Sequence, residues 1–277
     1  MQLLTEIERG LFSEGASVNL RNSVVAVVLL SMSAAAQTDA HEIIKRSVPV
    51  VEADWNAAPD YEYLERDREP GGGSKTFEDL MVMGSPYQRL VATDGNPLSP
   101  GEQEKQQRKL QGTIERRRNE TAQERAQRIA KYEKSRERDH LFLEQLTKAF
   151  NFILVGRRQL GDYQVYVLKA VPRPGYQPPN EEAEVLKGMR GDLWIDAKTY
   201  QWVKVRAYVT RPVWIEGFVA KVEPGTRFEL DKAKVEDDIW LPEHYMMEAR
   251  AKILFLFSHR SEDDETYSQY HKITTNH

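Results

Sequence analysis

The chain contains no cysteine among its 277 residues. This absence excludes disulfide bridges, a thiolate zinc site, a cysteine nucleophile and a lipid-anchored N-terminal cysteine. An excess of charge of one sign is also missing, because 39 Lys and Arg face 43 Asp and Glu, a formal net charge of −4. Charge this close to balance gives no general reason to bind nucleic acid. Charged residues at 30% and hydrophobic residues at 40% are proportions typical of a globular protein.

Long hydrophobic runs are missing as well. The apolar run near the start covers 24–36, whereas a bilayer-spanning helix needs about 20 apolar residues. With Arg21 before it and Ala34-Ala35-Ala36 at its end, the run has the three parts of a signal peptide. We therefore expect residues 1–36 to be a cleaved signal, with residues 1–17 reflecting a misassigned start. A buried core helix or strand is the alternative.

This assignment predicts a soluble protein of the periplasm or the cell exterior. The mature chain is expected to begin near Gln37 and to form one domain over residues 37–277. In such a compartment nucleic acid is not an expected partner.

The common catalytic motifs are incomplete or missing. Gly73-Ser74-Lys75-Thr76 lacks the glycines of a phosphate-binding loop, and His41-Glu42 has Lys45 where a zinc-protease helix needs its second His. No Gly-x-Ser-x-Gly elbow occurs, and the six His are scattered. The acidic runs 237–238 and 262–265 lack calcium-loop spacing, so we interpret them as solvated turns. We expect no enzyme, no metal site and no cofactor.

The first half of the mature chain predicts helix, strands and then a helical insertion. Apolar residues recur at helical spacing over 39–55, although Pro49 predicts a break or a kink there. Ser99-Pro100-Gly101-Glu102 is a capping box that starts a charged helical insertion over 100–150, with a break expected near Gly112. Arg116-Arg117-Arg118 on this insertion fits a solvated helix face or a docking face for a membrane or protein partner. Strands are expected at 61–68, 77–83 and 87–93.

From Phe152 onward the pattern is β. Gly161-Asp162 predicts a hairpin, and long period-2 alternation in 202–209 and 244–257 predicts antiparallel strands with one buried face. The fold class predicted is α+β: a strongly curved antiparallel sheet with helices on its concave face and the charged insertion. A two-sheet sandwich with the helix outside is the alternative.

The segment 188–272 resembles a known exported family. Its strand–Asp–turn–strand element at 191–205 and the Trp240-Leu241-Pro242 start of a long alternating strand are similar to the periplasmic lipoprotein-carrier superfamily, which includes LolA carriers and RseB-like sensors. Within this superfamily, the chain looks like members of an outer-membrane lipoprotein-sorting-like branch. The first half agrees in element order, but its insertion is longer and more polar than the central helices of typical carriers.

The resemblance implies an unclosed β-barrel around helices, with a hydrophobic cavity for acyl chains and no catalysis. The expected function is binding or transport of lipid or of an acylated lipoprotein, with the helix at 39–55 as a lid. The expected partners are that lipid or lipoprotein and an envelope membrane protein. The residues expected to line the cavity are Val203, Val205, Val209, Phe228, Leu230, Met247, Ile253 and Phe255.

Two alternatives stay open. The same apolar side chains can form a filled core, which is the usual fate of such stripes. The protein can also be an RseB-like regulatory or scaffold module that binds an envelope protein through its charged helix.

Overall fold

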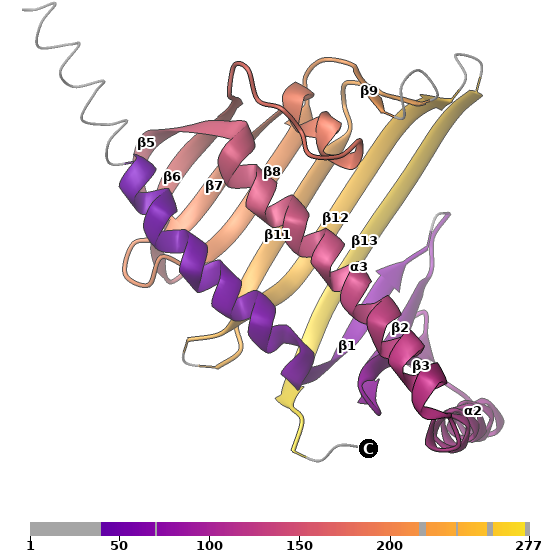
Figure 1. The fold of residues 1–277 in the computed structure, drawn as a ribbon. Helices are drawn as coiled ribbons and strands as arrows, with labels where there is room; N and C mark the ends of the chain where they lie inside the picture. The colour runs from indigo at the N-terminus through magenta and orange to yellow at the C-terminus, as the bar shows by residue number, and fades with distance from the viewer. Residues whose placement is uncertain (1–39, 70, 216–219, 237, 254–256, 275–277) are drawn as a thin grey trace, which may run out of the picture.

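One antiparallel sheet of 13 strands dominates the protein, and helices cross one of its faces (Figure 1). The computed structural model describes residues 40–69, 71–215, 220–236, 238–253 and 257–274. The predicted signal peptide at 1–36 lies outside them. Within the described part of the chain, none of the helices has an apolar stretch of the length that a bilayer requires.

The strand order joins the two ends of the chain in the middle of the sheet. The order is β4-β3-β2-β1-β13-β12-β11-β8-β7-β6-β5, and β10 pairs both β12 and β9 at the side. The strands are β1 (Tyr61–Arg68), β2 (Ser74–Val82), β3 (Ser85–Thr93), β4 (Asn96–Pro97), β5 (Phe150–Leu160), β6 (Tyr163–Pro172), β7 (Met189–Asp196), β8 (Trp202–Val209), β9 (Val213–Ile215), β10 (Ala220–Val222), β11 (Arg227–Lys234), β12 (Trp240–Ile253) and β13 (Phe257–Lys272). The end strands β4 and β5 are not paired with each other in this order, so the described sheet is an unclosed barrel. The predicted fold class is confirmed, and the two-sheet sandwich is excluded.

The helix predicted at 39–55 occupies residues 40–57 and is called the N-terminal helix here. The break expected at Pro49 was wrong, because helical structure runs through this residue, whose position is solvent-exposed. A short 3-10 helix, η1 (Ala58–Asp60), leads from it into β1.

The charged insertion forms two helices, α2 (Pro100–Arg118) and α3 (Ala122–Ala149). The predicted capping box is confirmed, with the Ser99 side chain accepting from the Glu102 N–H and the Glu102 side chain accepting from the Ser99 N–H. The break expected near Gly112 was wrong. It lies at residues 119–121, where Thr121 and Glu124 form a second capping box that starts α3.

The acidic run 262–265 is a third correction, because it lies within β13 rather than in a turn. Strand alternation sends Asp263 and Glu265 to one face of the sheet and Glu262 and Asp264 to the other. A run of four acids has no period-2 hydrophobic signal, which is why the sequence favoured a turn.

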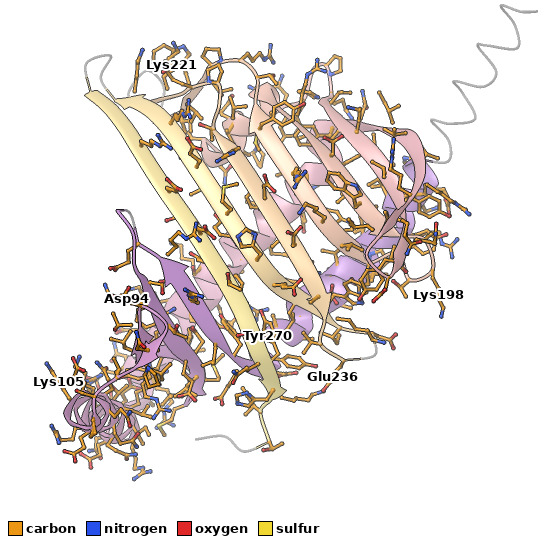
Figure 2. The ribbon with its side chains drawn as sticks, turned by 180° about the vertical axis from the view of Figure 1, so that it is seen from behind. Asp94, Lys105, Lys198, Lys221, Glu236 and Tyr270 are labelled. Carbon is orange, nitrogen blue, oxygen red and sulfur yellow. The ribbon has the colours of Figure 1, made fainter. Side chains whose placement is uncertain are left out.

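The core lies between the sheet and its helices. One cluster joins Ala40, Ile43 and Ile44 of the N-terminal helix to Leu168, Leu193, Ile195 and Trp202 of the sheet. A second joins the end of α3 to β7, β8 and the 3-10 helix η2 (Glu182–Gly188). Both helices thus cover the same concave face, and Figure 2 shows the opposite, outer face.

Candidate functional site

A groove separates the N-terminal helix from α3 on the concave face. Its volume is about 350 Å³, within the range of about 300–1,000 Å³ that small-molecule sites occupy. The N-terminal helix contributes one wall, α3 the other, and the sheet the floor. The lining residues are Val48, Val51, Glu52, Trp55, His140, Glu144, Thr147, Lys148 and Trp202. We call this the interhelical groove.

A second, smaller cavity lies against the sheet beside the groove and has an apolar lining. It measures about 40 Å³ and shares Trp202 with the interhelical groove. Val205 and Ala207 of β8 and Phe150 and Phe152 of β5 also line it. The concave face thus carries a groove of mixed lining between the helices and, next to it, a small apolar cavity against the strands.

Polar contacts hold the N-terminal helix against the sheet. Asp54 is 2% exposed and pairs with the buried Lys232 of β11. Its Oδ1 also accepts from the Trp240 N–H at 2.9 Å and from Gln201 Nε2 at 3.1 Å. Burial lowers the pKa of Lys232, and the Asp54 carboxylate opposes that shift. This ion pair and the two hydrogen bonds to Asp54 Oδ1 attach the end of the helix to the sheet.

Further contacts define the groove walls. The Trp202 indole N–H donates to Ser47 Oγ at 3.0 Å, and Ser47 in turn donates to the Ile44 carbonyl. Trp55 packs on His140 of α3 with ring centroids 4.4 Å apart, and the guanidinium of Arg136 lies 4.0 Å from the Trp55 ring centroid. Contacts between the helices therefore keep the groove to a defined width.

Most of the predicted cavity residues share the concave face. Val205 packs beneath the N-terminal helix, and Val209 packs beneath the end of α3. Leu230 lies directly opposite Val205 in the sheet, and Phe228 lies between Ala207 and Met247. Among these five, Val205 lines one of the two described cavities. Ile253 ends β12, but its side chain and residue 255 lie outside what the structure describes.

Val203 is placed on the other face. It packs with Val165, Val167 and Trp240 on the outer side of the sheet. The physical reason is a β-bulge, because Trp194 pairs with Lys204 while the next residue, Ile195, pairs with Trp202. The extra residue reverses the alternation, so Val203 and Val205 face opposite sides.

The part of the concave face formed by β1, β2 and β13 is polar. Oxygen atoms of Glu65, Asp67 and Glu265 all lie within 4.8 Å of one another. Tyr63 packs against the rings of Tyr267 and Tyr270 at 5.7 and 5.1 Å. We call these residues, together with Asp79, the tyrosine–carboxylate cluster.

Burial raises the pKa values of Glu65, Asp79 and Glu265 in this cluster. The pKa of Glu65 is about 8 because of burial, the nearby negative charge of Asp79 and a hydrogen bond with Asp67. Burial likewise raises the pKa of Asp79 to about 6 and raises that of Glu265. At neutral pH Glu65 therefore retains its proton, so the cluster does not present a full set of negative charges.

Several of these residues were missed by the sequence patterns. Asp54 lies 147 residues before Gln201 and 178 residues before Lys232. No sequence motif spans such separations, so spacing could not connect these residues. The groove residues of α3 sit in a charged helix with a thin apolar stripe. Thr121 and Glu124 did carry a usable signal, since they match the capping-box pattern.

The comparisons with known proteins give structural likeness only. No family model matches the chain. No curated protein is similar enough in sequence to count as a relative. Among solved structures, the chain is similar to a DUF1329 family protein from Desulfovibrio piger, with 9% identity and a TM-score of 0.29 over 86% of this chain and 94% of that one.

A second similar structure is a domain described as an outer membrane lipoprotein-sorting protein from Vibrio parahaemolyticus. It shows 10% identity and a TM-score of 0.32, again over 86% of this chain and 94% of that one. This description names the family that the sequence resembles. Structural similarity at these TM-scores supports no conclusion about function. The architecture of this protein is established by its own sheet and helices.

Proposed function

We propose that the protein is an exported envelope protein that binds lipid or lipoprotein acyl chains on the concave face of its sheet, with a role in outer-membrane lipoprotein sorting. The observation that carries the proposal is the interhelical groove, with Val48, Val51 and two Trp side chains around it and the apolar cavity beside it. Moving each acyl CH₂ group from water into such a space gains roughly 0.8 kcal/mol. The proposal is one of binding, without a catalytic step.

A single substitution in the groove wall tests this function. Val48 lines the groove but is 38% exposed, so Val48→Glu places a charge at the groove without burying it in the core. We expect affinity for a fluorescent fatty acid to fall by roughly tenfold or more, because an apolar contact worth about 1.5 kcal/mol is lost. Fluorescence titration measures the change.

The matched control is Ile153→Glu, the same chemical change at a 44% exposed apolar residue outside the groove lining. The control should keep wild-type affinity and an unchanged Tm. Equal affinities in both variants, or no fatty-acid binding by the wild type, would contradict the proposal. Native mass spectrometry of the purified protein, followed by organic extraction, would identify a co-purified acyl ligand at about equal stoichiometry.

A second candidate function is that of an RseB-like module that binds an envelope protein through its charged helix. The specific observation in its favour is that only Leu110 and Thr113 are buried along the 19 residues of α2. Arg108→Gln with Lys109→Gln should weaken capture of such a partner. Fatty-acid affinity should not change, because α2 does not line the groove.

A further inference from the structure

The outer face of the sheet carries basic side chains at the end where β10 pairs with β12. They are Lys221 of β10, Arg227 of β11, Arg250 and Lys252 of β12, and Arg260 of β13. Figure 2 views this face and labels Lys221 at that end of the sheet. We call these five residues the outer basic patch. They lie on the side of the sheet that the two helices do not cover.

The strand register places like charges directly opposite each other in this patch. Arg250 of β12 pairs with Arg260 of β13, and Lys252 of β12 pairs with Lys221 of β10. Like charges in directly opposed positions of an antiparallel pair are destabilising. The register therefore brings four positive charges close together on this face, and they need nearby carboxylates to offset their repulsion.

Carboxylates in the patch neutralise only part of that charge. Glu248, whose side chain is 5% exposed, contacts three guanidinium groups: Arg227 at 3.0 Å, Arg250 at 2.7 Å and Arg260 at 3.0 Å. Glu223 contacts Lys221 at 3.6 Å and Lys252 at 3.3 Å.

Glu262 lies 3.8 Å from Arg260 and is the third carboxylate in these described contacts. Five cations thus meet three anions. The three arginine side chains stay 50% to 61% exposed, with N–H groups available to a ligand.

We propose that the outer basic patch docks the protein on an anionic phospholipid surface. The cationic groups are spread over four strands, so they fit a surface that presents many negative charges. Arginine suits phosphodiester headgroups because its planar donors bind phosphate in pairs. Anionic membranes attract such basic residues. Docking through the outer face leaves the interhelical groove, on the opposite face, uncovered.

Vesicle co-sedimentation tests this docking. The purified protein is mixed with vesicles of equal parts phosphatidylglycerol and phosphatidylcholine, or with phosphatidylcholine alone. We expect binding to the anionic vesicles only. It should weaken as salt rises from about 0.1 M to about 1 M, because the Debye length falls from about 10 Å to about 3 Å.

Two double variants locate the surface. Lys221→Gln with Lys252→Gln leaves the contacts of Glu248 intact, and Arg250→Gln with Arg260→Gln removes the opposed arginines. Each should reduce binding by roughly 25-fold, since one basic residue near an anionic surface is worth roughly fivefold. Lys131→Gln with Lys134→Gln removes the same charge from exposed positions of α3 and should leave binding unchanged.

Several results would overturn the proposal. One is equal binding to neutral and anionic vesicles, and another is an equal loss in the α3 control. Competition by millimolar inorganic phosphate would indicate a site for a free anion. Binding to polyglutamate without binding to vesicles would indicate an acidic protein partner. Fatty-acid affinity is measured without vesicles, so failure of this proposal is distinguishable from failure of the acyl-binding function.

Discussion

At the scale of single residues, the tyrosine–carboxylate cluster shows how burial changes chemistry. Glu65, Asp67 and Glu265 come from two strands that lie far apart in sequence but pair in the sheet. In water each carboxyl would ionise near pH 4. Here burial and the negative charges nearby raise the pKa of Glu65 to about 8.

This raised pKa predicts that the cluster destabilises the protein as pH rises. The folded state binds the Glu65 proton more tightly than the unfolded chain, so its stabilising effect is complete below about pH 4.3 and is lost as pH approaches 8. Glu65→Gln should therefore raise the Tm at pH 8 and reduce the fall in Tm between pH 6 and pH 8. A change of about 1 kcal/mol in the free energy of unfolding shifts the Tm of a chain of this size by roughly 2–4 °C.

Differential scanning calorimetry across this pH range makes the measurement. Glu104→Gln, at an exposed position of α2, is the control and should follow the wild-type pH profile. If Glu65→Gln lowers the Tm at pH 8, Glu65 is ionised and stabilising there, contrary to the prediction.

At the scale of secondary-structure elements, the N-terminal helix depends on the sheet for its position. Its apolar stripe packs Ile43 and Ile44 on the strands, and Asp54 attaches its far end to β11 and β12. The interhelical groove exists because this helix and α3 rest on the same curved face without closing the space between them.

The effects of replacing Asp54 and Lys232 on the free energy of unfolding should therefore not be additive. Asp54→Asn leaves Lys232 buried without its counter-charge, which should lower the free energy of unfolding by about 3–5 kcal/mol. Asp54→Asn combined with Lys232→Met should be more stable than Asp54→Asn alone, because the unpaired charge is gone and Asn still accepts from Trp240. Urea unfolding of the wild type, both single variants and the double variant measures the coupling, and a purely additive result would contradict it.

At the scale of the whole molecule, the first and last strands of the described sheet hold its two parts together. β1 pairs with β13, so the part formed by β1 to β4 and α2 continues the sheet formed by the C-terminal strands. Arg68 of β1 also lies 3.3 Å from Asp264 of β13, and α3 contacts both β3 and β5. This connectivity predicts a single cooperative unfolding transition.

The positions of the tryptophans allow a direct test of this cooperativity. All five Trp lie outside residues 61–150, whereas α2 and α3 lie entirely inside that range. Tryptophan fluorescence and the helical circular dichroism signal should give the same urea midpoint. An earlier loss of the helical signal would mean that β1 to β4 and α2 unfold separately.

The sequence predicted most of the local structure for identifiable reasons. Strand 61–68 was predicted to the residue, and Ser99 and Gly161 marked a helix start and a hairpin. Predictions were wrong where the local sequence pattern favours one structure and the tertiary environment of the residue supports another. Pro49 was tolerated within the N-terminal helix, and the acids at 262–265 became part of a strand. The bulge at Val203 could not be predicted, because alternation there looks regular in the sequence.

What the sequence determined by itself was the set of elements and the α+β class, since helix caps, turns and hydrophobic periodicity are short-range properties. Tertiary structure alone decided which of those elements meet. The pairing of β1 with β13, the contact of Asp54 with Lys232 and the opposition of Arg250 and Arg260 depend on the register and curvature of the sheet. Local sequence patterns do not encode these contacts, because the packing of the whole sheet brings together residues that are far apart in the chain.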